Sequence, residues 1–243
     1  TESGRSANPP LGEQAPASAG AGSPVLRGTP RASARRLSAP LPTRTRGSTR
    51  TAMLVAAADL LRERGAAGVT IDAVLARSGA PRGSVYHHFP GGRSELLSSA
   101  LQFAGDEILD GIGAGTDTSA VTLLRRLATM WRTTLVDSHF TAGSPVLAAA
   151  VGSGADEQQL TSVAADIFRR WREASRQAYE RDGFDPDEAT ALAHMTISAF
   201  EGAVVLCRAT RSPQPIDDVA REMEFLIKAR AFVRRETAPG NSR

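Results

Sequence analysis

Apolar residues recur three and four positions apart along the chain from Thr49 onward, which is the spacing of helices that bury one face. Glycine and proline interrupt this pattern at intervals, so each stretch between them predicts one helix. Such helices are stable only when the apolar face is buried against another element. We therefore expect an all-α fold, with a short three-helix unit followed by a larger helical body.

The first three predicted helices are short and closely spaced. Thr49 is a candidate N-cap for the first helix, which ends at Gly65. Thr70 is a candidate N-cap for the second helix, which ends at Gly79. Pro81 favours the start of the third helix, because its missing N–H would be unpaired at that position anyway. Two short helices joined by a tight glycine-containing turn, with another helix before them, are typical of a DNA-binding helix-turn-helix unit.

The third helix has a polar outer surface. Val85 and Phe89 lie four residues apart and are expected to face the core. The residues left outside are small or polar, as close entry into a DNA major groove requires, and they are Arg82, Gly83, Ser84, Tyr86, His87 and His88. Arg93 follows at the start of the next helix, where a guanidinium and main-chain N–H groups can hold a phosphate.

These residues carry a resemblance to a known family. The stretch TRTAMLVAAADLLRERGAAGVTIDAVLARSGAPRGSVYHHFPGGRSELL resembles the N-terminal DNA-binding domain of TetR-family bacterial transcriptional regulators. The Pro-Gly-Gly after the third helix, and a later Glu-Gly-Ala run at residues 201–203, resemble the LmrA-like subgroup. The family usually has lysine where this chain has Arg93, and arginine keeps the charge.

The resemblance implies roles for individual residues. Tyr86, His87 and Arg93 would contact DNA phosphates, and residues near Arg82 and Ser84 would face the bases. The full set of expected DNA contacts is Thr49, Arg50, Thr70, Ala80, Pro81, Arg82, Gly83, Ser84, Tyr86, His87, His88 and Arg93. The alternative for Tyr86 is a half-buried packing role.

The two adjacent histidines raise the alternative of a metal or acid/base site. Neighbouring residues on a helix point about 100° apart, so His87 and His88 do not readily bind one ion. A zinc site needs about four ligands, and no cysteine or acidic cluster lies beside them in the sequence. We therefore expect no metal, no cofactor and no enzymatic activity.

The first 48 residues differ in composition from the rest. Residues 1–50 carry eight arginines and two glutamates, whereas the remaining residues have a net charge of −3. Residues 1–48 lack isoleucine and aromatic residues, so they cannot bury enough apolar surface to offset their ordering entropy. They predict either a solvated tail or a basic arm for DNA phosphates, using Arg35, Arg36, Arg44, Arg46 and Arg50. The predicted domains are 1–48 as a disordered tail, 49–96 for DNA binding, 97–234 for ligand binding and dimerisation, and 235–243 as a second disordered tail.

A ligand pocket is expected between the middle helices of the body. Large apolar groups and a few polar side chains fall on these helices, which favours a small and mostly apolar molecule. The candidates are Trp131, His139, Phe168, Trp171, His194, Met195, Ser198, Phe200 and Glu201. His194 and Glu201 lie seven residues apart and so share a helix face. They also leave open a helical-bundle enzyme or metal carrier, although the second carboxylate–histidine pair of such bundles is missing from the sequence.

The segment 186–207 is apolar almost all round, so we expect it to be buried on every side. Asp185, Pro186 and Glu188 give it a strong helix start. Together with the helix 216–233 it predicts a homodimer interface, in which Gly202 and Ala203 allow close helix approach. The candidate interface residues are Ile197, Val204, Cys207, Val219, Met223 and Leu226. The alternative is a monomer in which these helices are central.

The remaining composition suits a cytoplasmic protein. Cys207 is the only cysteine, so the 243 residues contain no internal disulfide. We expect neither a secretion signal nor a membrane-spanning helix. The sequence therefore predicts a dimeric repressor that binds a double-stranded DNA operator and responds to a small-molecule effector. A DNA-binding protein that needs no ligand is the main alternative.

Overall fold

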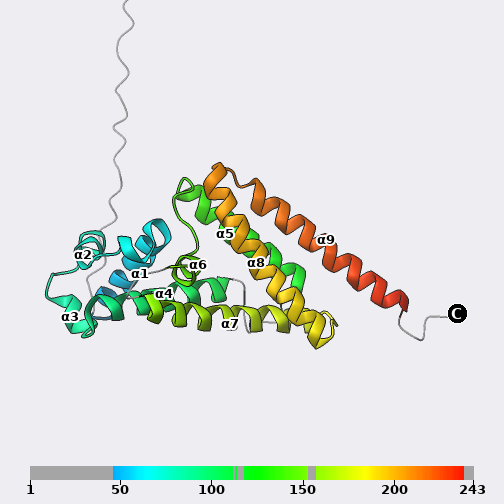
Figure 1. Ribbon diagram of the computed structural model, residues 1–243, viewed down its shortest axis with the longest axis horizontal. Coiled ribbons are helices and arrows are strands. Elements are labelled where there is room, and N and C mark those ends of the chain that lie inside the picture. The colour runs from blue at the N-terminus through cyan, green and yellow to red at the C-terminus, as the bar shows by residue number, and fades with distance from the viewer. Residues whose placement is uncertain (1–45, 112, 114–117, 153–156, 238–243) are drawn as a thin grey trace, which may run out of the picture. The chain divides into compact units, whose positions relative to one another are not determined.

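The computed structural model describes residues 46–111, 113, 118–152 and 157–237, and within these ranges every regular element is a helix (Figure 1). The elements are α1 (Arg46–Arg64), η1 (Ala66–Gly68), α2 (Ile71–Ser78), α3 (Ser84–His88), α4 (Gly92–Gly111), α5 (Ala120–Asp137), α6 (Pro145–Ala150), α7 (Glu157–Arg181), α8 (Pro186–Thr210) and α9 (Gln214–Thr237). The fold is all-α, as predicted. The two predicted tails lie almost wholly outside the described residues.

Two element boundaries differ from the sequence-based expectation at the N-terminal unit. α1 begins at Arg46, so Thr49 lies inside the helix and is not its N-cap. α3 begins at Ser84 and not at Pro81. Residues 81–83 form a turn instead, because the Ser84 N–H donates to the Pro81 carbonyl at 3.0 Å and Gly83 has little tendency to extend a helix. The predicted boundary between the two domains, after residue 96, falls inside α4.

The other predicted helix ends of this unit are confirmed. The Thr70 hydroxyl accepts a hydrogen bond from the Ala73 N–H at 3.1 Å and so caps α2. Gly79 ends α2 in the left-handed conformation, with φ of 63°, which glycine adopts without a steric cost. Val85 and Phe89 are fully buried, as expected. Val85 and Phe89 therefore anchor α3 on the core of this unit.

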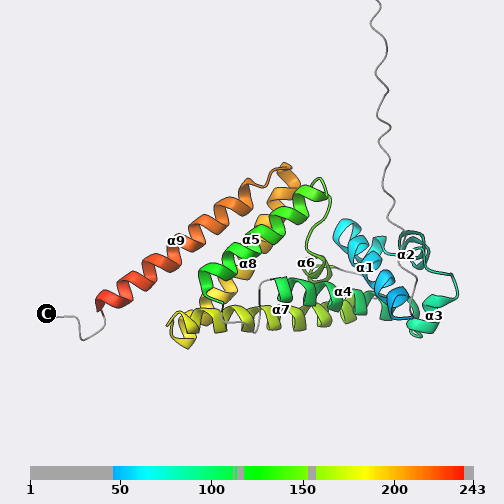
Figure 2. The same ribbon diagram turned by 180° about the vertical axis from the view of Figure 1, so that it is seen from behind.

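α4 continues from this unit into the helical body, where it runs beside α7 (Figures 1 and 2). The helices approach closely at Gly105, where an added Cβ would lie 2.8 Å from Cγ2 of the buried Ile167. The Trp171 indole N–H donates to the Gly105 carbonyl at 3.0 Å. This hydrogen bond fixes the position of the Trp171 side chain against α4.

α8 is the central helix of the body and packs against α7, α9 and α5. The Asp185 carboxylate accepts from the N–H groups of Asp187 and Glu188, as its predicted capping role requires. By length and composition alone α8 is apolar enough to cross a membrane, a test that a core helix also meets. Its packing against three other helices is that of a core helix.

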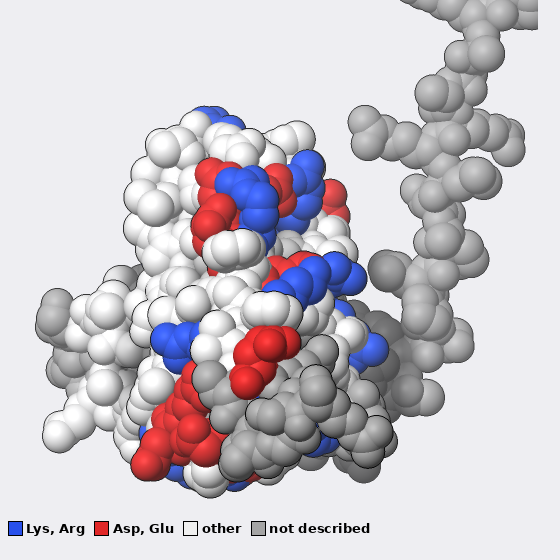
Figure 3. Space-filling model, turned by 90° about the vertical axis from the view of Figure 1, so that its right-hand side faces the viewer, with Lys and Arg blue, Asp and Glu red and all other residues white. Residues whose placement is uncertain are grey.

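Charged side chains on the surface are largely paired. In the view of Figure 3, acidic and basic side chains lie next to one another, with uncharged surface between the groups. The ion pairs of the body include Arg125–Glu224 and Arg230–Glu188. Hydrogen bonds from Arg125 and Lys228 lower the pKa of Glu224 to about 2.

Candidate functional site

The outer surface of α3 is exposed, as expected for a helix that contacts a partner. The Tyr86 residue is 63% exposed, which excludes the half-buried packing alternative for this side chain in the protomer. His87 is also exposed, whereas Ser84 and His88 are half-buried. The rings of His87 and His88 lie 4.9 Å apart at an interplanar angle of 69°. In the described parts of the chain, no group of three His, Cys, Asp or Glu side chains is placed to hold a metal ion.

Arg82 lies in the turn before α3 and is exposed together with Pro81 and Gly83. Its guanidinium donates to the Asp72 carboxylate at 2.6 Å, and this pair is open to solvent on both sides. Exposed ion pairs contribute little to stability, so Arg82 can exchange this partner for another acceptor. Ala80 is buried beside the turn and Thr70 is exposed at the N-cap of α2.

Arg93 has a different environment from the one expected. It is half-buried, and its Nε and Nη2 groups donate to the main-chain oxygens of Val69 and Ala66 at 2.8 and 2.7 Å. These bonds tie the start of α4 to the segment before α2. A lysine cannot make the same planar, two-point contact, so the arginine has a structural use at this position.

Arg50 of α1 lies near Phe89, the residue that follows α3. Arg50 is exposed, and its guanidinium lies 5.1 Å from the centre of the Phe89 ring. Thr49 is half-buried inside α1. Of the predicted basic arm, Arg35 and Arg36 lie outside the described residues, as does Arg44.

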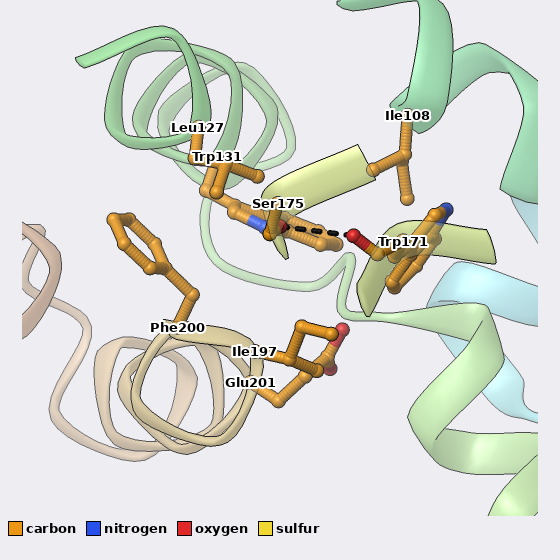
Figure 4. Close-up of a pocket in the computed structure, with 8 residues that line it drawn as sticks. All are labelled: Ile108, Leu127, Trp131, Trp171, Ser175, Ile197, Phe200 and Glu201. Carbon is orange, nitrogen blue, oxygen red and sulfur yellow. Dashed lines mark hydrogen bonds between the residues drawn. The ribbon is translucent and has the colours of Figure 1, made fainter. Parts of the chain in front are cut away.

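The body contains a cavity of about 20 Å³ at the meeting of α4, α5, α7 and α8 (Figure 4). Four of the predicted ligand residues line it, namely Trp131, Trp171, Phe200 and Glu201. The other lining residues are Ile108, Leu127, Ser175 and Ile197. A cavity of this volume holds about one water molecule, so a larger guest requires side chains to move.

Sequence reasoning missed Ser175, although a signal was present. Ser175 is four residues after Trp171 and therefore lies on the same face of α7. Ile108 and Leu127 also line the cavity and were not among the predicted ligand residues. Ile197 was assigned to the dimer interface and instead lines the cavity.

A second, more open cavity of about 250 Å³ lies between α7 and α8. It is lined by three other predicted ligand residues, Phe168, His194 and Ser198, together with Ala165, Arg169, Arg172 and Ile197. Ile197 lines both cavities, so its side chain stands between them. We call these two spaces the inner cavity and the outer cavity.

Two predicted ligand residues line neither cavity. Met195 is exposed, because it is five residues before Phe200 and so points about 140° away from it around α8. His139 is exposed in the loop after α5, where its backbone has a φ of 51°. The structure therefore brings neither residue to the two cavities, although both are near the other candidates in the sequence.

Among the described residues that line the inner cavity, only Glu201 is ionisable. Its Oε1 accepts a hydrogen bond from the Ser144 hydroxyl at 3.0 Å. Its Oε2 is buried and has no hydrogen-bond partner among the described residues. Burial raises the pKa of the Glu201 carboxyl to about 7, and the hydrogen bond from Ser144 opposes this rise.

Ser144 connects Glu201 to the N-terminal unit. Its hydroxyl accepts from the Leu147 N–H and thereby caps α6. The preceding residue, Gly143, donates its N–H to the Arg62 carbonyl of α1 at 2.8 Å. A short chain of hydrogen bonds and covalent bonds therefore runs from the inner cavity to α1.

The predicted interface residues Val204, Cys207 and Met223 are buried within the protomer. Val204 and Cys207 follow Phe200 at helical spacing and share its inward face, which is why they cannot be reached by a second chain. Ile197, Val219 and Leu226 are half-buried. Burial inside one protomer thus overturns this choice of residues for the first three.

A different set of apolar residues is exposed on α8 and α9. We call it the outer α8–α9 face, and it consists of Met195, Gly202, Val205, Leu206, Phe225, Phe232 and Val233. Phe225 and Phe232 are seven residues apart and so lie on one side of α9. The same spacing relates Met195 and Gly202 on α8. The helix 186–207 is therefore apolar all round because one side meets the core and another lies open in the protomer.

The sequence and fold are similar to known proteins. The family model "Bacterial regulatory proteins, tetR family" matches residues 53–100, and "Transcriptional regulator LmrA/YxaF-like, C-terminal domain" matches residues 120–222. An HTH-type transcriptional regulator of Mycobacterium tuberculosis H37Rv is 40% identical over 182 residues, which cover 73% of this chain and 93% of that protein.

More distant relatives agree with these matches. The HTH-type transcriptional regulator YxaF of Bacillus subtilis 168 is 25% identical over 186 residues, covering 76% of this chain and 97% of that protein. Among solved structures, the regulatory protein TetR from Rhodobacter sphaeroides has a TM-score of 0.63 at 19% identity. That match covers 72% of this chain and 97% of the other, and it shows a shared fold.

Proposed function

The chain belongs to the TetR family of bacterial transcriptional regulators and has an LmrA/YxaF-like C-terminal domain, and from this premise we propose that it is a dimeric repressor that binds a palindromic DNA operator and is released by a small, mostly apolar effector. Membership of the family makes the protein a DNA-binding transcriptional regulator and not an enzyme. A regulator of transcription acts at the chromosome, so we place it in the cytoplasm.

The observation that carries the DNA-binding proposal is the division of α3 into a fully buried and an exposed side. Val85 and Phe89 hold the helix on the core, which leaves Tyr86 and His87 at the surface. A small helix held in this way enters a major groove without disturbing its own scaffold. We assign base reading to Arg82 and Ser84 and phosphate contact to Tyr86 and His87.

For Arg93 we propose a positioning role beside its phosphate role. The guanidinium holds the start of α4 against the carbonyls of Ala66 and Val69. This places the start of α4 next to the end of α3, where its N-terminal N–H groups can donate hydrogen bonds to a DNA phosphate.

The hydrogen-bond chain from Glu201 to α1 supports control by an effector. A guest in the inner cavity that draws Glu201 away from Ser144 also changes the capping of α6. Because Gly143 is bonded to Arg62, a shift of the α6 start reaches α1 directly. An effector that favours one position of α6 therefore biases the position of the DNA-contacting unit.

For the homodimer we propose the outer α8–α9 face as the interface. Its exposed apolar residues recur at helical spacing on each of two helices that pack together, and a second copy related by two-fold symmetry would cover them. The two half-sites of a palindromic operator require two DNA-binding domains in one molecule, which a homodimer supplies.

The proposal is tested with the purified full chain and random duplex DNA. Repeated selection of bound DNA should enrich an inverted repeat, whose half-sites are separated by about one helical turn or a multiple of it. Enrichment of a single, non-repeated site contradicts dimeric operator binding. Failure to enrich any sequence contradicts operator recognition as a whole.

A ligand-independent DNA-binding protein is the second candidate, and the small volume of the inner cavity favours it. A space of about 20 Å³ excludes an organic molecule unless side chains move. The two candidates differ in the response of the operator complex to small molecules. A regulator without an effector keeps its operator affinity in the presence of every compound that binds the body.

A further inference from the structure

Glu201 Oε2 is the one polar atom of the inner cavity without a partner among the described residues, and in the ionised carboxyl group it is an acceptor. The Ser175 hydroxyl donates to the Trp171 carbonyl at 2.9 Å, and the Trp171 indole N–H donates to Gly105. Both groups thus have partners, whereas the buried Oε2 of Glu201 has none among the described residues. A buried acceptor without a hydrogen-bond partner costs free energy. A guest that donates a hydrogen bond to Oε2 therefore gains more binding free energy than one that does not.

The charge of the cavity lining further restricts the guest. α4 contributes Ile108, α5 contributes Leu127 and Trp131, and α7 contributes Trp171 and Ser175. None of these side chains is ionisable. Ser144, the N-cap of α6, donates a neutral hydrogen bond to the Glu201 carboxyl group. Among the described residues no basic side chain lines the inner cavity, so none there neutralises Glu201 or receives an anionic guest.

We propose that the effector is a primary amine with an aromatic or other apolar body, and that its ammonium group binds the free carboxylate oxygen of Glu201 while its body lies among Trp131, Trp171 and Phe200. The proposal rests on the proposed effector control and names the chemistry of that same site. An ammonium supplies both the missing donor and the missing positive charge. The three aromatic side chains give the cation and the apolar body favourable contacts.

The route into the site runs past Ile197. This residue is half-buried and lines both the inner and the outer cavity. In the proposed route, a change of its rotamer joins the outer cavity of about 250 Å³, which Arg169 and Arg172 also line, to the space at Glu201. The outer cavity thus provides the room that the inner cavity lacks.

Binding of matched small molecules to the full chain tests the proposal. The probes are 2-phenylethylamine, the uncharged 2-phenylethanol and the anionic 3-phenylpropanoate, with binding measured by calorimetry. We expect the amine to bind about ten-fold or more tightly than the alcohol, since a charged hydrogen bond is stronger than a neutral one. The carboxylate should bind most weakly, because it would lie against Glu201.

Two substitutions assign the effect to the cavity. Glu201→Gln keeps the shape of the side chain and should abolish the advantage of the amine over the alcohol. Glu222→Gln removes a carboxylate that is 70% exposed and should leave that advantage unchanged. Ile197→Ala should strengthen binding of the larger amine tryptamine, because it opens the passage between the two cavities.

The wild type provides an independent readout if Glu201→Gln does not fold. Amine affinity should rise as the pH is raised through about 7, because the carboxyl then becomes charged, whereas the affinity of the alcohol should not. The proposal is overturned if the carboxylate binds as tightly as the amine, if Glu201→Gln retains the preference, or if none of the probes binds. These measurements contain no DNA, so they can fail while operator selection succeeds, and the reverse also holds.

Discussion

A buried carboxyl group in an apolar cavity makes the stability of the protein depend on pH. Glu201 has a pKa raised by burial from 4.5 to about 7. The folded state therefore holds the Glu201 proton more tightly than the unfolded chain does. The resulting stabilisation is complete below about pH 4.5 and is lost as the pH rises through about 7.

Glu201→Gln should remove this dependence. Relative to the variant, the wild type should lose up to about 3 kcal/mol of unfolding free energy between pH 5 and pH 8, at about 1.4 kcal/mol per pKa unit. Urea unfolding of both proteins at several pH values measures the difference. Parallel curves for the two proteins would show that Glu201 is ionised in the folded state throughout this range.

Arg82 and Arg93 should differ in what their removal changes. Arg82→Ala should alter base preference at one half-site position and leave the thermal midpoint almost unchanged, because its partner Asp72 is also exposed. Binding motifs selected from random DNA, together with melting curves, measure both effects. An unchanged motif would remove Arg82 from the base-reading residues.

Arg93→Ala should instead weaken binding to all sequences about equally and also lower the thermal midpoint. The variant loses two hydrogen bonds to main-chain oxygens, and each such bond is worth about 1 kcal/mol or more. Arg93→Lys keeps the charge and serves as the control: it should restore the salt dependence of DNA binding better than it restores stability. Full stability in Arg93→Ala would contradict the positioning role.

At the scale of helices, capping and breaking residues were the most dependable sequence signals. Thr70 and Asp185 cap the helices they were assigned to, because a short polar side chain before an apolar stretch has few other uses, whereas Thr49 lies inside α1. Pro81 was misleading, since proline also suits the first positions of a turn. Periodicity could show that α8 is apolar all round, but only tertiary packing determines which side faces the core.

The close approach of α4 and α7 should make Gly105 intolerant of a side chain. In Gly105→Ala the new Cβ would lie 2.8 Å from Cγ2 of Ile167, which is itself fully buried and cannot move aside freely. We expect a loss of about 1–3 kcal/mol in unfolding free energy. Denaturant unfolding measures it.

Gly111→Ala is the matched control for this substitution, because it lies in the same helix and its Cβ would be 3.4 Å from the flexible Met130 sulfur. Alanine favours helix more than glycine does, so this variant should be neutral or slightly more stable. Equal effects of the two substitutions would mean that the helices are not packed closely at Gly105.

At the scale of the whole molecule, the sequence indicated a dimer held by the last two long helices but selected residues from their inward side. Val204 and Cys207 are apolar for the sake of the protomer core, whereas Val205 and Leu206, next to them in the sequence, are exposed. Single-sequence reasoning could not separate these pairs, because both are apolar and the helix has no polar side to orient it. The cavity residues show the same limit, since Ile197 reads equally well as interface or pocket.

The corrected interface leads to a prediction about assembly and DNA affinity. Val205→Arg places a charge on the outer α8–α9 face, at a residue that is 50% exposed in the protomer. The charge should dissociate the dimer without unfolding the chain, because it stays in water once the partner leaves. Operator affinity should then fall by about 10²–10⁴, because each DNA-binding domain loses the effective concentration that the dimer provides.

Val136→Arg changes a valine of α5 that is 44% exposed, and it should leave both assembly and affinity as they are. Light scattering and operator binding, measured on the same samples with circular dichroism to check folding, distinguish these outcomes. A wild type that is monomeric at high micromolar concentration would refute the dimer, and a dimeric Val205→Arg protein with normal operator affinity would show that the interface lies on another surface.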